Sequence, residues 1–203
     1  MNSLSLLTAF APWVAFALIA QAPLGNPGLS LILAFVIAIA LALLTSYHQL
    51  VKGYILAIVS LAFFAVFFIL IIGLGQYYLA NYIAVLSMLM LTLVSWGTIL
   101  FRFPFTLQYS REGVEPERVK SPQFMRVNYI ITAVWALAFT AGFVINLFLM
   151  FYPTVQGLIF WDNVQWVFMI LAIIFTIWYP AHVHKERALE AMMKYRPDLL
   201  KNM

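Results

Sequence analysis

Long apolar runs separated by short polar links are the feature that most constrains this chain. A helix of about 20 apolar residues is long enough to cross the hydrocarbon core of a lipid bilayer. The sequence contains six runs of this kind, at residues 4–20, 29–47, 54–72, 78–101, 129–150 and 164–179. This pattern predicts an all-α, polytopic membrane protein built as a bundle of six transmembrane helices.

The composition favours the same class of protein. Of the 203 residues, 65% are apolar and 9% are charged, whereas about a quarter of the residues in a soluble domain are charged. A soluble domain of this length could not hide so much hydrocarbon, because about a quarter to a third of the unfolded surface stays exposed after folding. A disordered chain is also excluded, since disorder requires low hydrophobicity and high charge.

The positions of the charges predict the orientation. With six spans, the N-terminus, the links after the second and fourth spans, and the C-terminus all lie on one side. Every basic residue falls on that side: Lys52, Arg102, Arg111, Arg118, Lys120, Arg126, Lys185, Arg187, Lys194, Arg196 and Lys201. The only charge on the other side is Asp162. Because basic residues concentrate in cytoplasmic loops, we expect an inner (plasma) membrane protein with both termini in the cytoplasm.

The predicted organisation has two parts. Residues 1–180 form the six-helix transmembrane domain, in which residues 101–126 are a cytoplasmic loop, and residues 181–203 form a cytoplasmic helix and tail. Pro12 is expected to kink the first span, because proline lacks an amide hydrogen. Residues 20–22 resemble a signal-peptidase site, but the basic segment of a signal peptide is missing, so a retained first span is favoured. Cleavage would leave five spans.

Residue types that carry catalytic and metal chemistry are absent or unsuitably placed. The chain has no cysteine, which excludes thiolate metal sites. His48, His182 and His184 lie at span ends and do not have the spacing of a zinc-hydrolase motif. The cores of the spans contain no ionisable side chain, which disfavours a proton-coupled pump. We expect no catalytic residue, metal or cofactor, and no nucleic-acid partner, since no basic stripe interleaved with aromatic residues is present.

Polar and small residues share one face of the fifth span. At about 100° per residue, Asn128, Trp135, Gly142 and Asn146 fall within about 40° of one stripe. The favoured interpretation is a packing face, on which the amides bond across the bundle and Gly142 lets a neighbouring helix approach closely. The alternative is a lining that contacts a solute or a lipid.

The start of the sixth span carries a capping pattern. Asp162 is followed three residues later by Gln165, which is the spacing of a helix N-cap and its reciprocal partner. Asp162 is therefore predicted to cap this helix.

The loop at residues 101–126 begins with large apolar side chains that alternate with other residues. They are Phe103, Phe105, Leu107 and Tyr109. We expect this stretch to lie at the membrane surface with its rings buried in the interface. A docking surface for a cytoplasmic or membrane partner is the functional alternative.

The second half of the chain carries a pattern that resembles a known family. A basic residue and a proline lead into an apolar stretch with a glutamine, and after a polar loop a basic-x-Asn sequence opens a helix with Trp, Phe, Gly and Asn on one face. The matching positions here are Arg102, Pro104, Gln108, Arg126, Asn128, Trp135, Phe139, Gly142 and Asn146. Over residues 101–150 the chain resembles the bacterial intracellular septation protein A family of small inner-membrane proteins. The resemblance implies a role in septation and envelope maintenance, with no catalytic residues.

Two functions follow from these patterns. The first is a non-enzymatic envelope protein that acts through protein or lipid contacts. Its expected partners are the lipid bilayer, other envelope or division membrane proteins, and further copies of itself in an oligomer. The alternative is a small permease or channel for a neutral or lipidic solute, lined by the polar stripe of the fifth span. The two are distinguished by whether Asn128, Trp135 and Asn146 line a cavity or are sealed against other helices.

Overall fold

The computed structural model describes residues 3–22, 26–152 and 159–195. All regular structure in these residues is helical. Five helical segments are long and apolar enough to cross a membrane: Pro27–Thr45, Ile55–Gly73, Tyr77–Leu100, Pro122–Phe151 and Asn163–Val183. They correspond to the second to sixth predicted spans. The chain thus has the architecture of a multi-pass helical membrane protein.

The first predicted span is divided into two short helices. α1 (Ser3–Ala9) and α2 (Ala11–Ala20) are separated at Phe10, and Pro12 lies in the first turn of α2. The kink expected near Pro12 is confirmed, and its cause is the missing amide hydrogen of proline. Neither α1 nor α2 alone reaches the length of about 20 residues that a span requires.

The remaining helices begin and end largely where the sequence favours a cap or a break. They are α3 (Pro27–Thr45), α4 (Tyr47–Val51), α5 (Ile55–Phe68) with its π-helical extension η1 (Ile69–Gly73), the 3-10 helix η2 (Tyr77–Tyr82), α6 (Ile83–Leu100), α7 (Phe105–Ser110), α8 (Pro116–Val119), α9 (Pro122–Phe151) and α10 (Ile159–Tyr195). The side chains of Asn26 and Ser121 cap α3 and α9 by accepting bonds from backbone amides of the first turn. Each is followed by a proline at the first helical position, where proline costs no intrahelical bond.

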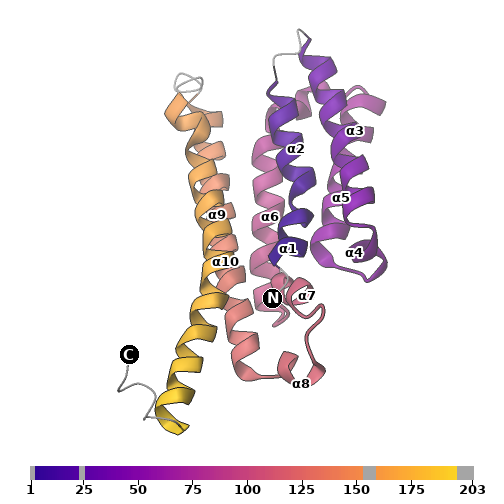
Figure 1. Ribbon diagram of the computed structural model, residues 1–203. Coiled ribbons are helices and arrows are strands. Elements are labelled where there is room, and N and C mark those ends of the chain that lie inside the picture. Colours follow the sequence, from indigo (N-terminus) through magenta and orange to yellow (C-terminus); the bar gives the residue numbers. More distant parts are fainter. Residues whose placement is uncertain (1–2, 23–25, 153–158, 196–203) are drawn as a thin grey trace.

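The long helices stand side by side (Figure 1). α2 packs on α3, α3 on α5, α6 on α9, and α9 on α10. The start of α1 and the short helices α4, α7 and α8 gather at one end of the bundle, the end toward which α10 extends. The C-terminal ends of α2 and α9 lie at the opposite end.

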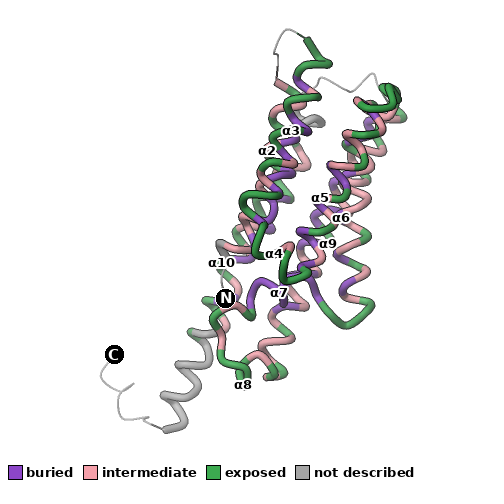
Figure 2. The backbone as a smooth tube through the Cα atoms, turned by 90° about the vertical axis from the view of Figure 1, so that its right-hand side faces the viewer, coloured by how far each residue is buried: buried purple, intermediate pink, exposed green. Residues whose placement is uncertain are grey.

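The core is centred on aromatic side chains where the junction of α1 and α2 meets α9. The ring of Phe10 stacks on Trp135, with a centroid distance of 4.4 Å, and also contacts Phe105 and Phe139. Buried residues occupy the facing sides of the helices, and exposed ones lie on the outer sides (Figure 2). Many of those outer residues are large and apolar, including Leu44 and Leu100. An apolar outer surface of this extent is typical of helices that contact lipid.

Two expectations about the end that carries α7 are wrong. The stretch expected to lie at the membrane surface instead folds back under the bundle, because Phe105 to Ser110 form α7 and all six of its residues are buried. Figure 2 shows α7 in the colour of buried residues. The helix expected after Pro180 is not separate from the sixth span, since α10 continues through Pro180 to Tyr195. Proline removes only one backbone bond, and neighbouring groups in a packed membrane helix accommodate that loss.

Candidate functional site

The buried helix α7 is attached to α9 by a network of polar side chains. Asn128 lies at its centre. Its Oδ1 accepts a hydrogen bond from the Ser110 hydroxyl at 2.7 Å, and its Nδ2 donates to the Phe124 carbonyl at 2.8 Å. The Thr106 hydroxyl donates to the Asn128 carbonyl at 3.0 Å and lies 2.8 Å from the Thr132 hydroxyl. Asn128 therefore joins two helices and is not available to a solute.

Other residues of the predicted loop pattern hold the second side of α7. The Gln108 Oε1 accepts a hydrogen bond from the Ile55 amide at 2.9 Å. Gln108 thereby supplies a partner for a backbone N–H in the first turn of α5, where such groups have no acceptor within the helix. Pro104 is buried and immediately precedes α7. The Phe105 amide donates to the Thr98 hydroxyl on α6 at 3.3 Å. α7 is thus bound to α5, α6 and α9 together.

The rest of the α9 stripe is used for packing against neighbouring helices. Trp135 is fully buried, and its indole N–H donates to the Thr176 hydroxyl on α10 at 2.9 Å. A Cβ atom added at Gly142 would lie 3.0 Å from the Met88 Sδ on α6. Asn146 is half-buried, and its Nδ2 donates to the Gln165 Oε1 at 2.6 Å. These contacts favour the packing interpretation of the stripe. Asn128, Trp135 and Asn146, which suggested a permease with a polar lining, are hydrogen-bonded to neighbouring helices.

The capping role predicted for Asp162 is wrong. The helix already includes Ile159, so Asp162 lies inside the helix, whereas an N-cap residue precedes the first helical residue. The apolar residues at 159–161 continue the helix on the N-terminal side. Gln165, the expected reciprocal partner, is bonded to Asn146 across the helix pair.

The two basic residues of the pattern remain on the surface. Arg102 and Arg126 are both exposed. Arg102 lies in the turn between α6 and α7 with a φ of 59°, a conformation that residues other than glycine seldom adopt. The turn therefore sets the backbone position from which the Arg102 side chain extends. Arg126 lies in the second turn of α9. Between them, the intervening α7 is buried.

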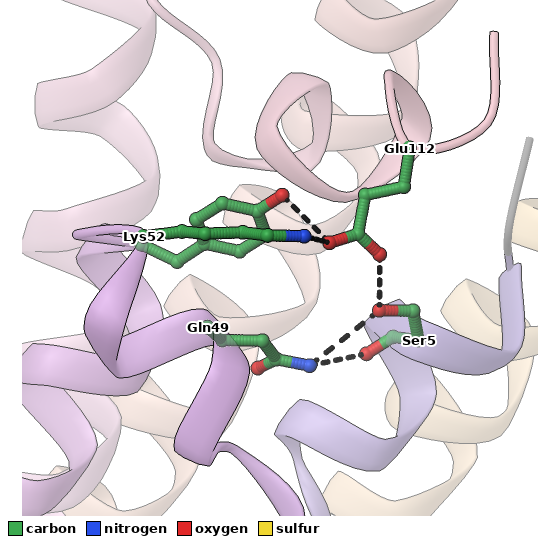
Figure 3. Close-up of polar contacts among 5 residues, drawn as sticks. Ser5, Gln49, Lys52 and Glu112 are labelled. Carbon is green, nitrogen blue, oxygen red and sulfur yellow. Dashed lines mark hydrogen bonds and ion pairs between the residues drawn. The ribbon is translucent and has the colours of Figure 1, made fainter.

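A second polar cluster, which the sequence analysis missed, surrounds Glu112 at the same end of the bundle (Figure 3). The Glu112 carboxylate accepts hydrogen bonds from the Lys52 ammonium at 2.9 Å, the Tyr54 hydroxyl at 2.8 Å and the Ser5 hydroxyl at 3.2 Å. The Gln49 Nε2 donates to the Ser5 carbonyl at 3.2 Å. These contacts join α1, the α4–α5 link and the turn after α7. No local motif signals them, because 60 residues separate Lys52 from Glu112.

The electrostatics of this cluster favour the ionised carboxylate. Burial acts to raise the pKa of Glu112, but the hydrogen bonds from Lys52, Tyr54 and Ser5 outweigh it and leave the pKa below its ordinary value. The same hydrogen bond to Glu112 raises the pKa of Lys52. Beside the cluster is an open pocket of about 510 Å³, lined by Ser5, Thr8, Thr45, His48, Gln49, Lys52 and Glu112.

An apolar groove lies between α9 and α10. Its volume is about 440 Å³. The lining residues are Val134, Leu137, Ala138, Ala141, Phe168, Leu171, Ala172, Ile174, Phe175 and Trp178. Because the lining offers no charged or hydrogen-bonding group except the Trp178 indole, an apolar chain is the ligand type that it suits.

Nothing outside the chain itself identifies its family or its chemistry. Comparison with known protein families, with curated proteins and with solved structures finds no match. Among the described residues, no group of three or more His, Cys, Asp or Glu side chains is placed to hold a metal ion. The resemblance to the septation protein A family stays a prediction from residues 101–150.

Proposed function

We propose that the chain is a six-span protein of the inner (plasma) membrane with both termini in the cytoplasm. In this arrangement α1 and α2 together form the first span. At 1.5 Å per residue, the stretch from Ser3 to Ala20 measures about 27 Å, close to the hydrocarbon thickness of about 30 Å. The orientation is supported by the basic residues, because Lys52, Arg102 and Lys120 belong to links at the end where α4, α7 and α8 gather.

Within that membrane, we propose a non-enzymatic envelope protein that acts in septation and envelope maintenance through contacts made at its cytoplasmic end. One observation carries this proposal. Thr106, Gln108 and Ser110 of α7 and Asn128 of α9 are hydrogen-bonded inside the bundle, whereas Arg102 and Arg126 are exposed on either side of the buried α7. Exposed guanidinium groups suit recognition of carboxylate or phosphate groups on a partner.

The proposal is tested in cells by removing these two charges. We expect Arg102→Gln and Arg126→Gln, separately and together, to reduce co-purification of envelope or division proteins and to alter cell shape or division as deletion of the gene does. Lys120→Gln is the matched control, because Lys120 is also exposed in the same loop. The protein level must be equal in all strains.

One result would overturn this proposal. It is wild-type shape, division and co-purification both in the deletion strain and in the double variant.

A further inference from the structure

The groove between α9 and α10 has the shape of a binding site for an extended apolar chain. Its floor consists of small residues, since Ala138 and Ala172 are buried. Its walls are large side chains that stay exposed, including Leu137, Leu171 and Trp178. Alanines between bulky neighbours leave a hollow that is open to whatever surrounds the helix pair, which in a membrane protein is lipid.

The length of the groove distinguishes a lipid from a partner helix. On α10 the lining runs from Phe168 to Trp178, ten residues or about 15 Å along the helix axis. That is half of the hydrocarbon thickness of about 30 Å, and the groove lies in the middle of the apolar span Asn163–Val183. A transmembrane helix of a partner would need a contact face along the whole span, whereas a short groove suits an acyl chain.

Basic residues lie where the groove reaches the end that carries α7. On α10, His182 and Lys185 follow Trp178 by about one and two turns, and both are exposed. The ring of His182 stacks on Trp178 at a centroid distance of 4.8 Å, which places it directly beyond the groove.

The opposite side of this mouth is formed by α9. Trp135 on α9 is hydrogen-bonded to Thr176 on α10. Asn146, eleven residues after Trp135, is hydrogen-bonded to Gln165, eleven residues before Thr176. The two helices are therefore antiparallel in constant register. In the same register Arg126, nine residues before Trp135, lies level with Lys185, nine residues after Thr176. Positive charge therefore lies on both helices at one end of an apolar groove.

We propose that the α9–α10 groove binds one anionic phospholipid, with an acyl chain against Ala138 and Ala172 and the phosphate beside Lys185 and Arg126. Lipid headgroups are bound elsewhere by basic pockets between transmembrane helices on the cytoplasmic side. Assignment to the cytoplasmic leaflet rests on the orientation proposed above, but the binding itself does not.

The test is lipid retention by the purified full-length protein, measured by native mass spectrometry. Phosphatidylglycerol and phosphatidylcholine with identical acyl chains are added in detergent. We expect one phosphatidylglycerol to be retained in preference to phosphatidylcholine. Lys185→Gln is expected to weaken retention of phosphatidylglycerol about fivefold, since one basic residue near an anionic lipid is worth about 1 kcal/mol. Lys185 is chosen over Arg126 because Arg126 also belongs to the proposed partner surface.

A second variant tests the groove itself. Ala141→Leu fills the hollow and is expected to reduce retention of both lipids. The matched controls are Lys120→Gln and Ala62→Leu, the latter on the exposed side of α5, and both are expected to retain lipid as the wild type does. Circular dichroism and the elution volume verify that each variant is folded.

Two results would overturn the proposal. One is equal retention of the two lipids by the wild type and all variants. The other is a wild type that elutes as a dimer and an Ala141→Leu variant that elutes as a monomer with unchanged lipid retention, which would make the groove an interface between copies of the chain.

Discussion

Asn128 connects α7 to α9 at the end of the bundle that carries α7. It is 1% exposed, and its amide bonds both Ser110 on α7 and the Phe124 carbonyl on its own helix. Removing one partner from a buried hydrogen bond costs about 1–3 kcal/mol, because the remaining group keeps its desolvation penalty. We therefore expect Asn128→Ala to lower the apparent midpoint of thermal unfolding in detergent. Asn81→Ala, at an exposed position in η2, is the control and should leave the midpoint unchanged. Equal midpoints for the two variants would contradict the connecting role.

Glu112 makes the stability of the same end depend on pH. Although burial acts to raise the pKa of Glu112, its hydrogen bonds bring the folded-state pKa below the ordinary value of 4.5. A carboxyl whose pKa is lower in the folded than in the unfolded chain stabilises the fold above the unfolded pKa, and this contribution disappears as the pH falls through the folded pKa. Below about pH 4.5 we expect the unfolding midpoint of the wild type to fall.

The comparison that isolates Glu112 is Glu112→Gln, which removes the titrating group. We expect this variant to be less stable than the wild type at pH 7 and to lose less stability on acidification. Glu117→Gln, at an exposed position on α8, serves as the control. If the unfolding midpoints of the wild type and Glu112→Gln changed with pH in parallel, protonation of Glu112 would not be a cause of the loss of stability.

Among the helices, α6 and α9 approach each other at a glycine. A Cβ at Gly142 would lie 3.0 Å from the Met88 Sδ, and methionine is flexible enough to move by a few tenths of an ångström. We expect Gly142→Ala to have a small effect and Gly142→Leu to destabilise the protein by about 1–3 kcal/mol through overpacking.

A second substitution makes this contact specific. Met88→Ala should restore part of the stability lost in Gly142→Leu, and the unfolding free energies of the two single variants and the double variant give the coupling. Gly97→Leu on α6 is the control, because nothing lies within 4 Å of a Cβ at Gly97. Additive effects of the Met88 and Gly142 changes would refute the contact.

The elements differ in how far the sequence predicts them. The long spans follow from apolar length alone, since lipid imposes one requirement on every residue of a span. The path of α7 could not be inferred in this way, because its burial depends on Thr106, Gln108 and Ser110 finding partners on α9 and α5. The same is true of the Glu112 cluster, whose members come from three separate segments. Pro180 misled the prediction because a packed membrane helix tolerates proline better than a soluble helix does.

At the scale of the whole molecule, the absence of native cysteines makes the proposed topology directly measurable. Gln76→Cys and Glu117→Cys place single thiols at exposed positions in links on either side of α6. In spheroplasts we expect a membrane-impermeant maleimide to label Gln76→Cys from outside and Glu117→Cys only after lysis. The reverse pattern would invert the orientation.

A third variant tests the broken first span. Ser3→Cys, at the start of α1, should be labelled only after lysis if α1 and α2 cross the membrane together. Labelling of Ser3→Cys in intact spheroplasts would reduce the protein to five spans. Cys-free wild-type protein controls for labelling of other groups.

The contact between Phe10 and Trp135 has a consequence for how the protein is made. The Trp135 ring on which Phe10 stacks is synthesised 125 residues after Phe10 itself. At about 5–20 residues per second, that interval is roughly 6–25 s. During this time α1 lacks its partners on α7 and α10, and Phe10 lacks the Trp135 ring, so lipid or the insertion machinery must cover these surfaces. The segment that carries Phe10 therefore reaches its final environment only after α9 has been made, and quality control that senses unpaired membrane helices would act on every chain that stops before α9.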